Sequence, residues 1–143
     1  MNLFGVLEIN ASGLKAQRQR AEVVAANLAN AETTLTTEGG PYRRRHVVFH
    51  AEVPRFSDLL SSRVREGVAG VAVREVVEDS SAALRRYEPG HPDADASGYV
   101  SYPAINPAEE LVDLMGAARS YQLNVSAASA CKQMIQQSLE ILR

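Results

Sequence analysis

The segment from Asn106 to Leu142, NPAEELVDLMGAARSYQLNVSAASACKQMIQQSLEIL, decides the fold class. Its apolar residues recur at alternating steps of three and four, the spacing of residues along one face of a helix. A seven-residue repeat sustained this long predicts a helix that supercoils against partner helices. The repeat comprises Leu111, Leu114, Ala118, Tyr121, Val125, Ala128, Lys132, Ile135, Leu139 and Leu142, and Lys132 is its only charged member.

The start of this helix carries capping chemistry. Asn106 is placed to accept a hydrogen bond from an early backbone N–H, and Pro107 follows at the first helical position. Glu109 stands where a carboxylate reaches back to a free backbone N–H, as in a capping box. The sequence therefore predicts that the helix begins at Pro107.

The first thirty residues show the same periodicity. The sequence predicts a helix from Leu3 to Asn30, which ends at the threonine-rich run before Gly39-Gly40-Pro41. Polar residues on this seam, as at Lys132, either fix the register of a helix pair or face a solvated groove or channel. The seam is formed by Leu3, Leu7, Asn10, Leu14, Gln17, Ala21, Val24 and Leu28.

The residues between the two helices favour strands. Val47 to Val53 alternate as in a half-buried strand that Pro54 closes, and residues 57–70 are expected to form a short helical turn and a loop. Further strands are expected at Gly70–Val77, Leu84–Tyr87 and Tyr99–Tyr102, with a turn at Pro89–Asp93.

The predicted fold is therefore mainly α with a small β insert. Residues 1–35 and 104–143 would form a discontinuous terminal-helix domain of long antiparallel helices in a coiled-coil-like bundle. Residues 36–103 would form an extended segment and a small β module with a β-hairpin. One pair of helices has a single seam, so we expect several copies of the chain, or close relatives, to cover the remaining apolar positions.

Composition narrows the possible functions. A net charge of −2 gives no general attraction to nucleic acid, and no apolar stretch is long enough to span a bilayer, so neither partner is expected. Cys131 is the only cysteine, which excludes an internal disulfide and cysteine-based zinc sites. The first ten residues lack the features of a secretory signal peptide. We expect no cofactor and no bound metal.

Two polar groups could instead mark a site. His91, Asp93 and Asp95 resemble a metal or acid–base cluster, but the same stretch is an ordinary polar turn, and we favour the turn. Arg43-Arg44-Arg45 could bind phosphate, and an interface or solvated edge is the better interpretation. A small hydrolase that uses His91 and Asp93 is retained only as a minor alternative.

Several short motifs together identify a family resemblance. They are SGLKA at 12–16, ANLANA at 26–31, TEGGPYRR at 37–44, YEPGHPDAD at 87–95, Gly98–Val100, Asn106–Glu110, Ala118–Tyr121 and Lys132–Met134. In this combination, across nearly the whole chain, the sequence resembles the axial proteins of the bacterial flagellum, and within them the proteins of the proximal rod.

The resemblance implies a structural protein and no enzyme. It implies unfolded export through the flagellar type III apparatus without a cleaved signal peptide, followed by helical polymerisation in the periplasmic part of the basal body. The terminal helices would form the drive shaft and the export channel wall. The implied partners are copies of itself, other rod proteins, and basal-body ring and export-gate components. A soluble coiled-coil adaptor in the cytoplasm is the alternative.

The expected assembly interface lies on both terminal helices. Its residues are Leu3, Leu7, Leu14, Val24, Asn27, Leu28 and Asn30 in the first helix, and Leu111, Leu114, Ala118, Tyr121, Val125, Ala128, Ile135, Leu139 and Leu142 in the last.

Overall fold

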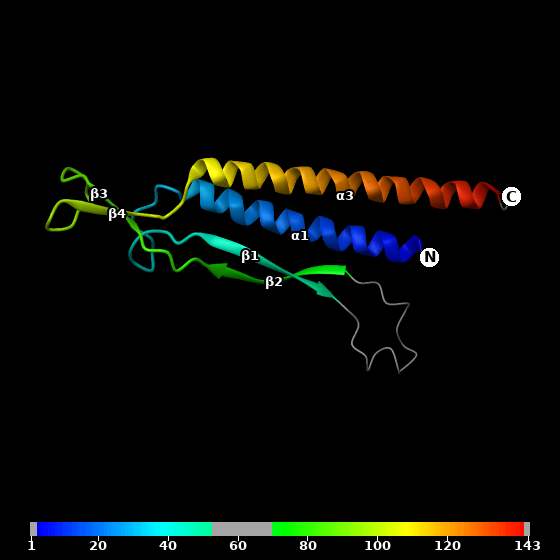
Figure 1. The fold of residues 1–143 in the computed structure, drawn as a ribbon, viewed down its shortest axis with the longest axis horizontal. Helices are drawn as coiled ribbons and strands as arrows, with labels where there is room; N and C mark the ends of the chain where they lie inside the picture. Colours follow the sequence, from blue (N-terminus) through cyan, green and yellow to red (C-terminus); the bar gives the residue numbers. More distant parts are fainter. Residues whose placement is uncertain (1–2, 53–69, 142–143) are drawn as a thin grey trace, which may run out of the picture.

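Two long helices and two β-hairpins make up the described part of the chain (Figure 1). The computed structural model describes residues 3–52 and 70–141. Helix α1 (Leu3–Ala29) and helix α3 (Pro107–Ile141) run antiparallel side by side, and the chain termini lie at the same end of this helix pair. The predicted fold class is confirmed.

The end of each helix that borders the β segments is held by an asparagine. The Oδ1 atom of Asn106 accepts a hydrogen bond from the Ala108 N–H at 3.1 Å, as predicted for the start of α3. The Nδ2 atom of Asn30 donates to the carbonyl of Ala26 at 2.9 Å, and the same carbonyl accepts from the Asn30 N–H at 3.1 Å. The other half of the predicted capping box is wrong, because Glu109 accepts from the Asn106 side chain at 3.1 Å rather than from a backbone N–H.

Strands β1 (Arg45–Glu52) and β2 (Gly70–Glu78) form one antiparallel hairpin, with Arg45 opposite Glu78 and Glu52 opposite Gly70. A bulge between Val48 and Phe49 interrupts the regular alternation. Strands β3 (Leu84–Tyr87) and β4 (Tyr99–Tyr102) form the second, with the predicted bounds. Val53, Pro54 and the loop predicted after them lie outside the described residues.

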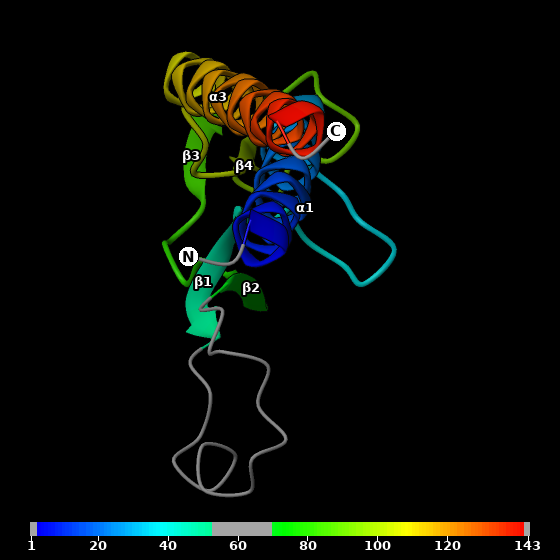
Figure 2. The same ribbon diagram turned by 90° about the vertical axis from the view of Figure 1, so that its right-hand side faces the viewer.

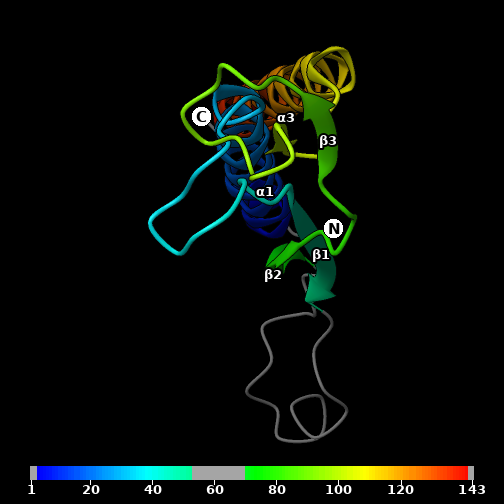
Figure 3. The same ribbon diagram turned by 90° about the vertical axis from the view of Figure 1, so that its left-hand side faces the viewer.

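Helix α1 lies between α3 and the β1–β2 hairpin (Figures 2 and 3). The β3–β4 hairpin projects beyond the end of the helix pair, where it contacts none of the other described helices and strands (Figure 1). The buried apolar residues of the described chain are few: Ala16, Val24, Val100, Ile105, Ala117 and Cys131. The contact between the helices therefore depends on small side chains and on polar pairs.

Candidate assembly interface

The face of α3 that contacts α1 is polar and small. Glu110 receives a hydrogen bond from Asn27 of α1, and Cys131 lies 3.9 Å from the amide nitrogen of Asn10. Between Glu110 and Cys131 on α3, the Asn124 side chain lies close to Gly13 of α1. A Cβ added to Gly13 would lie 3.0 Å from the Asn124 amide nitrogen. Together with buried Ala117, these α3 residues follow one another at intervals of seven. They form the seam of the helix pair within one molecule.

The apolar repeat predicted for α3 lies beside this seam. Leu111, Ala118 and Val125 each follow a seam residue by one position, which turns them about 100° around the helix axis. Leu111 is 49% exposed, Val125 42% and Leu139 62%. Ala118 and Tyr121 are also exposed, while Leu114, Ala128 and Ile135 are half-buried. The molecule leaves much of this repeat uncovered.

The predicted α1 residues divide into two groups. Leu7, Leu14 and Leu28 are half-buried, and Asn30 is half-buried at the helix end. Val24 is 6% exposed and Asn27 only 1%, so neither presents a surface to another molecule in this conformation. The side chains of Leu3 and Leu142 lie outside the described residues.

The seven-residue apolar repeats of α1 and α3 lie on the same side of the helix pair. In α1, Leu14 and Leu28 follow Gly13 and Asn27, which face α3, just as Leu111 follows Glu110 in α3. Because both helices are right-handed and antiparallel, the same one-residue offset turns both repeats to the same side. Ser12, one residue before Gly13, turns the other way and accepts a hydrogen bond from the β2 residue Val71 at 3.1 Å. The β1–β2 hairpin, which contacts α1 and not α3, therefore packs on one side of α1, and the two apolar repeats lie on the other side.

We call the exposed or half-buried residues of this second side the apolar ridge. It comprises Leu7, Leu14 and Leu28 of α1 and Leu111, Leu114, Ala118, Tyr121, Val125, Ala128, Ile135 and Leu139 of α3. Val112, Met115 and Leu123 of α3 are also exposed, at 68%, 71% and 63%, and the predicted repeat did not include them. A steady seven-residue pattern selects one stripe, and these residues lie off it on other faces of the helix.

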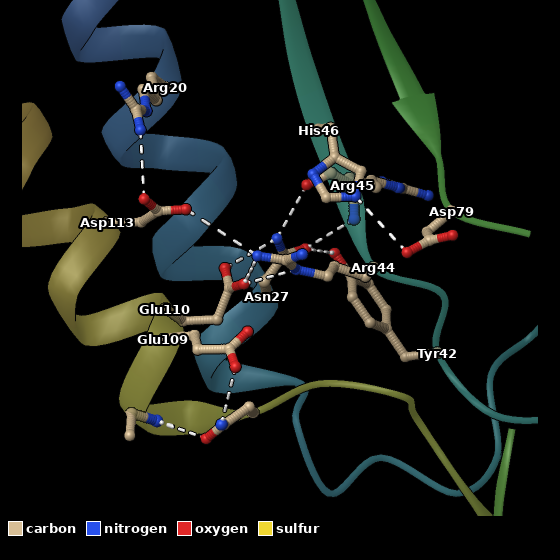
Figure 4. Close-up of polar contacts among 12 residues, drawn as sticks. Arg20, Asn27, Tyr42, Arg44, Arg45, His46, Asp79, Glu109, Glu110 and Asp113 are labelled. Carbon is tan, nitrogen blue, oxygen red and sulfur yellow. Dashed lines mark hydrogen bonds and ion pairs between the residues drawn. The ribbon is translucent and has the colours of Figure 1, made fainter. Parts of the chain in front are cut away.

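A buried polar cluster joins the helix pair to the β1–β2 hairpin (Figure 4). Its centre is the Asn27 side chain, which makes four hydrogen bonds. The Nδ2 atom donates to the Arg45 carbonyl at 2.8 Å and to Glu110 Oε2 at 3.0 Å. The Oδ1 atom accepts from the Arg45 N–H at 2.9 Å and from the Tyr42 hydroxyl at 3.1 Å. This uses the full hydrogen-bonding capacity of an amide side chain.

Glu110 is the charged member of this cluster at the helix seam, and its side chain is 1% exposed. Its Oε1 atom accepts from Arg44 Nε at 2.6 Å and lies 2.5 Å from Arg44 Nη2, while its Oε2 atom accepts from Asn27. Both carboxylate oxygens are therefore occupied. The polar cluster, defined as Asn27, Tyr42, Arg44, Glu110 and the backbone of Arg45, satisfies its buried charge within the molecule.

Two further contacts extend this arrangement. Asp113, one turn along α3, lies 3.2 Å from Arg20 of α1 and 3.9 Å from Arg44 (Figure 4). Burial raises the pKa of the Tyr42 phenol above its ordinary value of 10.0. Sequence patterns did not predict the cluster, since its members come from three segments far apart in the chain.

The stretch His91–Asp95 is organised as a turn. The Nδ1 atom of His91 accepts from the Asp93 N–H at 3.1 Å, and Asp95 Oδ1 accepts from the N–H groups of Ser97 and Tyr99 at 2.8 and 2.9 Å. The hydrogen bond from Tyr99, with that from Ser97 and the nearby Arg85, lowers the pKa of Asp95 below its ordinary value of 3.8. Each of these groups has a role in holding the loop, which favours the predicted turn.

No described helix has the length and apolar character required to cross a bilayer. Residues 7–34, which cover most of α1, match the family described as "Flagella basal body rod protein". Residues 96–141, which cover β4 and α3, match "Flagellar basal body rod FlgEFG protein C-terminal". Asn27 and Glu110 each lie in one of these matched regions.

Three relatives that match over their full length carry the same name. The flagellar basal-body rod protein FlgC of Bacillus subtilis is 43% identical to this chain, over 99% of both chains. FlgC of Aquifex aeolicus is 41% identical, over 98% of this chain and 97% of its own, and FlgC of Escherichia coli O6:H1 is 38% identical, over 99% and 98%. With matches of this identity and coverage, the chain belongs to the FlgC family of flagellar basal-body rod proteins.

Proposed function

We propose that this protein is a structural subunit of the flagellar rod that polymerises through its terminal helices. The observation that carries the proposal is the full-length identity to relatives named as rod proteins. Within the molecule, the apolar ridge supports it. The β1–β2 hairpin packs on α1 and does not contact α3, and the repeat on α3 leaves Leu111, Val125 and Leu139 at 42–62% exposure. Apolar stripes of this length on a helix pair are usually covered by further helices.

The finer proposal concerns place and partners. We propose that the subunit belongs to the proximal rod, that the packed helices form the drive shaft and the export channel wall, and that the β segments lie outside them. Its neighbours would be copies of itself, other rod proteins, and components of the basal-body rings and the export gate. Export would use the flagellar type III apparatus. The role is mechanical, and no catalytic step is part of it.

Fractionation tests the proposal directly. A tagged copy that restores swimming to a strain lacking the gene is followed through the purification of intact hook–basal bodies. We expect the protein in the purified particles after washing has removed soluble proteins, and basal bodies without a complete rod in the deletion strain. Blocking flagellar export should leave the protein inside the cells. If the protein stays in the cytoplasm while export is active, it is not a rod subunit, and the coiled-coil adaptor becomes the better interpretation.

A further inference from the structure

We infer that the polar cluster sets the register of the two terminal helices, with Glu110 as the positioning residue that couples α3 to α1 and to the β1–β2 hairpin. The inference concerns the fold of one molecule and does not depend on how molecules assemble. It rests on the contrast between packing residues that repeat every seven positions and a buried carboxylate, that of Glu110, which occurs at one position of the seam only.

The packing residues of the helix seam allow more than one register. Positions 110, 117, 124 and 131 of α3 face α1 at intervals of seven, and the apolar ridge repeats with the same period. Along the stripe of Leu114, Tyr121, Ala128 and Ile135, a slide of α3 by one heptad would bring an apolar residue to each place that an apolar residue leaves. Elsewhere the slide would bring Asn124 to the place of Ala117 and Lys132 to that of Val125. Regular heptads specify a helix pair but leave its register open, and single polar positions on the seam are the known means of fixing it.

The polar cluster discriminates between these registers. A slide by seven residues in one direction would replace Glu110 with Ala117 opposite Asn27. Arg44, whose side chain is 22% exposed, would then lose the carboxylate that lies 2.5 Å from its Nη2 atom. Asn27 would lose one of its four partners, although it would keep those in the Tyr42–Arg45 segment. A partly buried cation without its partner is strongly disfavoured, so the slid register is rejected.

The same contacts link the hairpin to the register. Asn27 holds both backbone polar atoms of Arg45, the first residue of β1, while Arg44 binds Glu110. The position at which β1 begins along α1 and the position of α3 along α1 are thus determined by one set of hydrogen bonds. The ion pair of Arg20 with Asp113 and the close approach of the Asn124 side chain to Gly13 agree with the same register.

Spin-label distance measurements on the monomeric chain test the inference. The labels are attached at Glu22→Cys in α1 and Gln133→Cys in α3, both exposed, after Cys131→Ala removes the native thiol. These two sites are offset along the helix pair, so a slide of α3 by one heptad, about 10 Å, would change the distance between the labels by most of that amount.

The test variant is Arg44→Met with Glu110→Leu, which removes both charges at similar volume and so avoids leaving one charge unpaired. Glu109→Gln, at the exposed neighbouring residue, is the matched control.

We expect one narrow distance distribution for the labelled parent and for Glu109→Gln. The double variant should retain the circular dichroism of a helical protein. Its label-to-label distances should show either a second population, shifted by nearly ~10 Å from the parent distance, or a distribution at least twice as broad as that of the parent. A single narrow distribution at the parent distance in the double variant would overturn the inference. So would loss of helical structure in the double variant, because the pair would then be required for folding itself and not for register.

Discussion

The side chain of Asn27 pairs with Arg45 as a neighbouring β-strand would. Its Nδ2 atom donates to the Arg45 carbonyl at 2.8 Å and its Oδ1 atom accepts from the Arg45 N–H at 2.9 Å. Backbone groups on the open side of a two-stranded hairpin otherwise remain unpaired. Asn27, the second residue of the sequence signature ANLANA, therefore continues the hydrogen-bonding pattern of β1 onto α1.

This pairing predicts that Asn27→Ala is among the most destabilising polar substitutions in the chain. It removes the partners of the Arg45 N–H and carbonyl and one donor to buried Glu110. Each buried polar group left unsatisfied costs about 1–3 kcal/mol, so we expect a total loss of about 3 kcal/mol in the free energy of unfolding. Urea unfolding followed by circular dichroism measures it.

Asn30→Ala is the matched control, three residues further on and directly after the end of α1. The Asn30 side chain bonds the exposed Ala26 carbonyl and the part-buried Thr33 hydroxyl, and it holds no buried charge, so its loss should cost about 1 kcal/mol or less. Equal losses for the two substitutions would show that the pairing with Arg45 adds nothing to stability.

The β3–β4 hairpin contains a glycine that its turn requires. Gly98 has a φ of +78°, and an added Cβ would lie 2.9 Å from Cε2 of Tyr87. We therefore expect Gly98→Ala to destabilise this hairpin by about 1–2 kcal/mol. Amide hydrogen exchange should be faster at Val100 and Tyr102, while the amides of the helix pair keep their rates. Gly90→Ala is the control, because an added Cβ there meets no atom within 4 Å. Similar exchange in both variants would contradict the steric argument.

The same hairpin should loosen in acid. The pKa of Asp95 is lowered, first by the hydrogen bond from the Tyr99 N–H, so its carboxylate favours the folded loop. A depressed pKa means that this contribution is complete above the ordinary value of 3.8 and is lost as the pH falls through the lower folded value. The amide resonances of Ser97 and Tyr99 should shift together over this window in an NMR titration, and Asp95→Asn should remove the transition. A shift already complete near neutral pH would contradict the assignment.

Sequence patterns predicted the helices and strands because each has a local cause. Asparagine caps, glycine-rich turns and regular apolar spacing operate within a few residues, and the bounds of α3, β3 and β4 follow from them. The orientation of α3 was harder to predict. Apolarity marks the stripe containing Leu111 and Val125, whereas the face against α1 consists of Glu110, Asn124 and small residues. When two helices are held together by small residues and polar contacts, the residues of the contact face form only a weak apolar pattern in the sequence.

Local sequence patterns could not predict the polar cluster for a different reason. Asn27 and Glu110 are separated by 83 positions, and Arg44 lies in a run of three arginines whose members look alike in the sequence. The tertiary fold alone distinguishes Arg44, half-buried against Glu110, from exposed Arg43. One available signal was the charged residue at position 110, which shares the seven-residue spacing of Ala117, Asn124 and Cys131.

The apolar ridge supplies the last prediction, which separates assembly from folding. Val125→Glu places a carboxylate on the ridge at a residue that is 42% exposed, so the free energy of unfolding of the monomer should change by no more than about 0.5 kcal/mol. If neighbouring helices cover this position in the rod, an unpaired charge there costs several kcal/mol and assembly fails. Swimming in soft agar should be abolished and the variant absent from purified basal bodies. Ser126→Glu adds the same charge at the next, also exposed residue, about 100° around α3, and should leave assembly largely intact. Normal swimming with Val125→Glu would mean that this part of the ridge faces solvent in the rod.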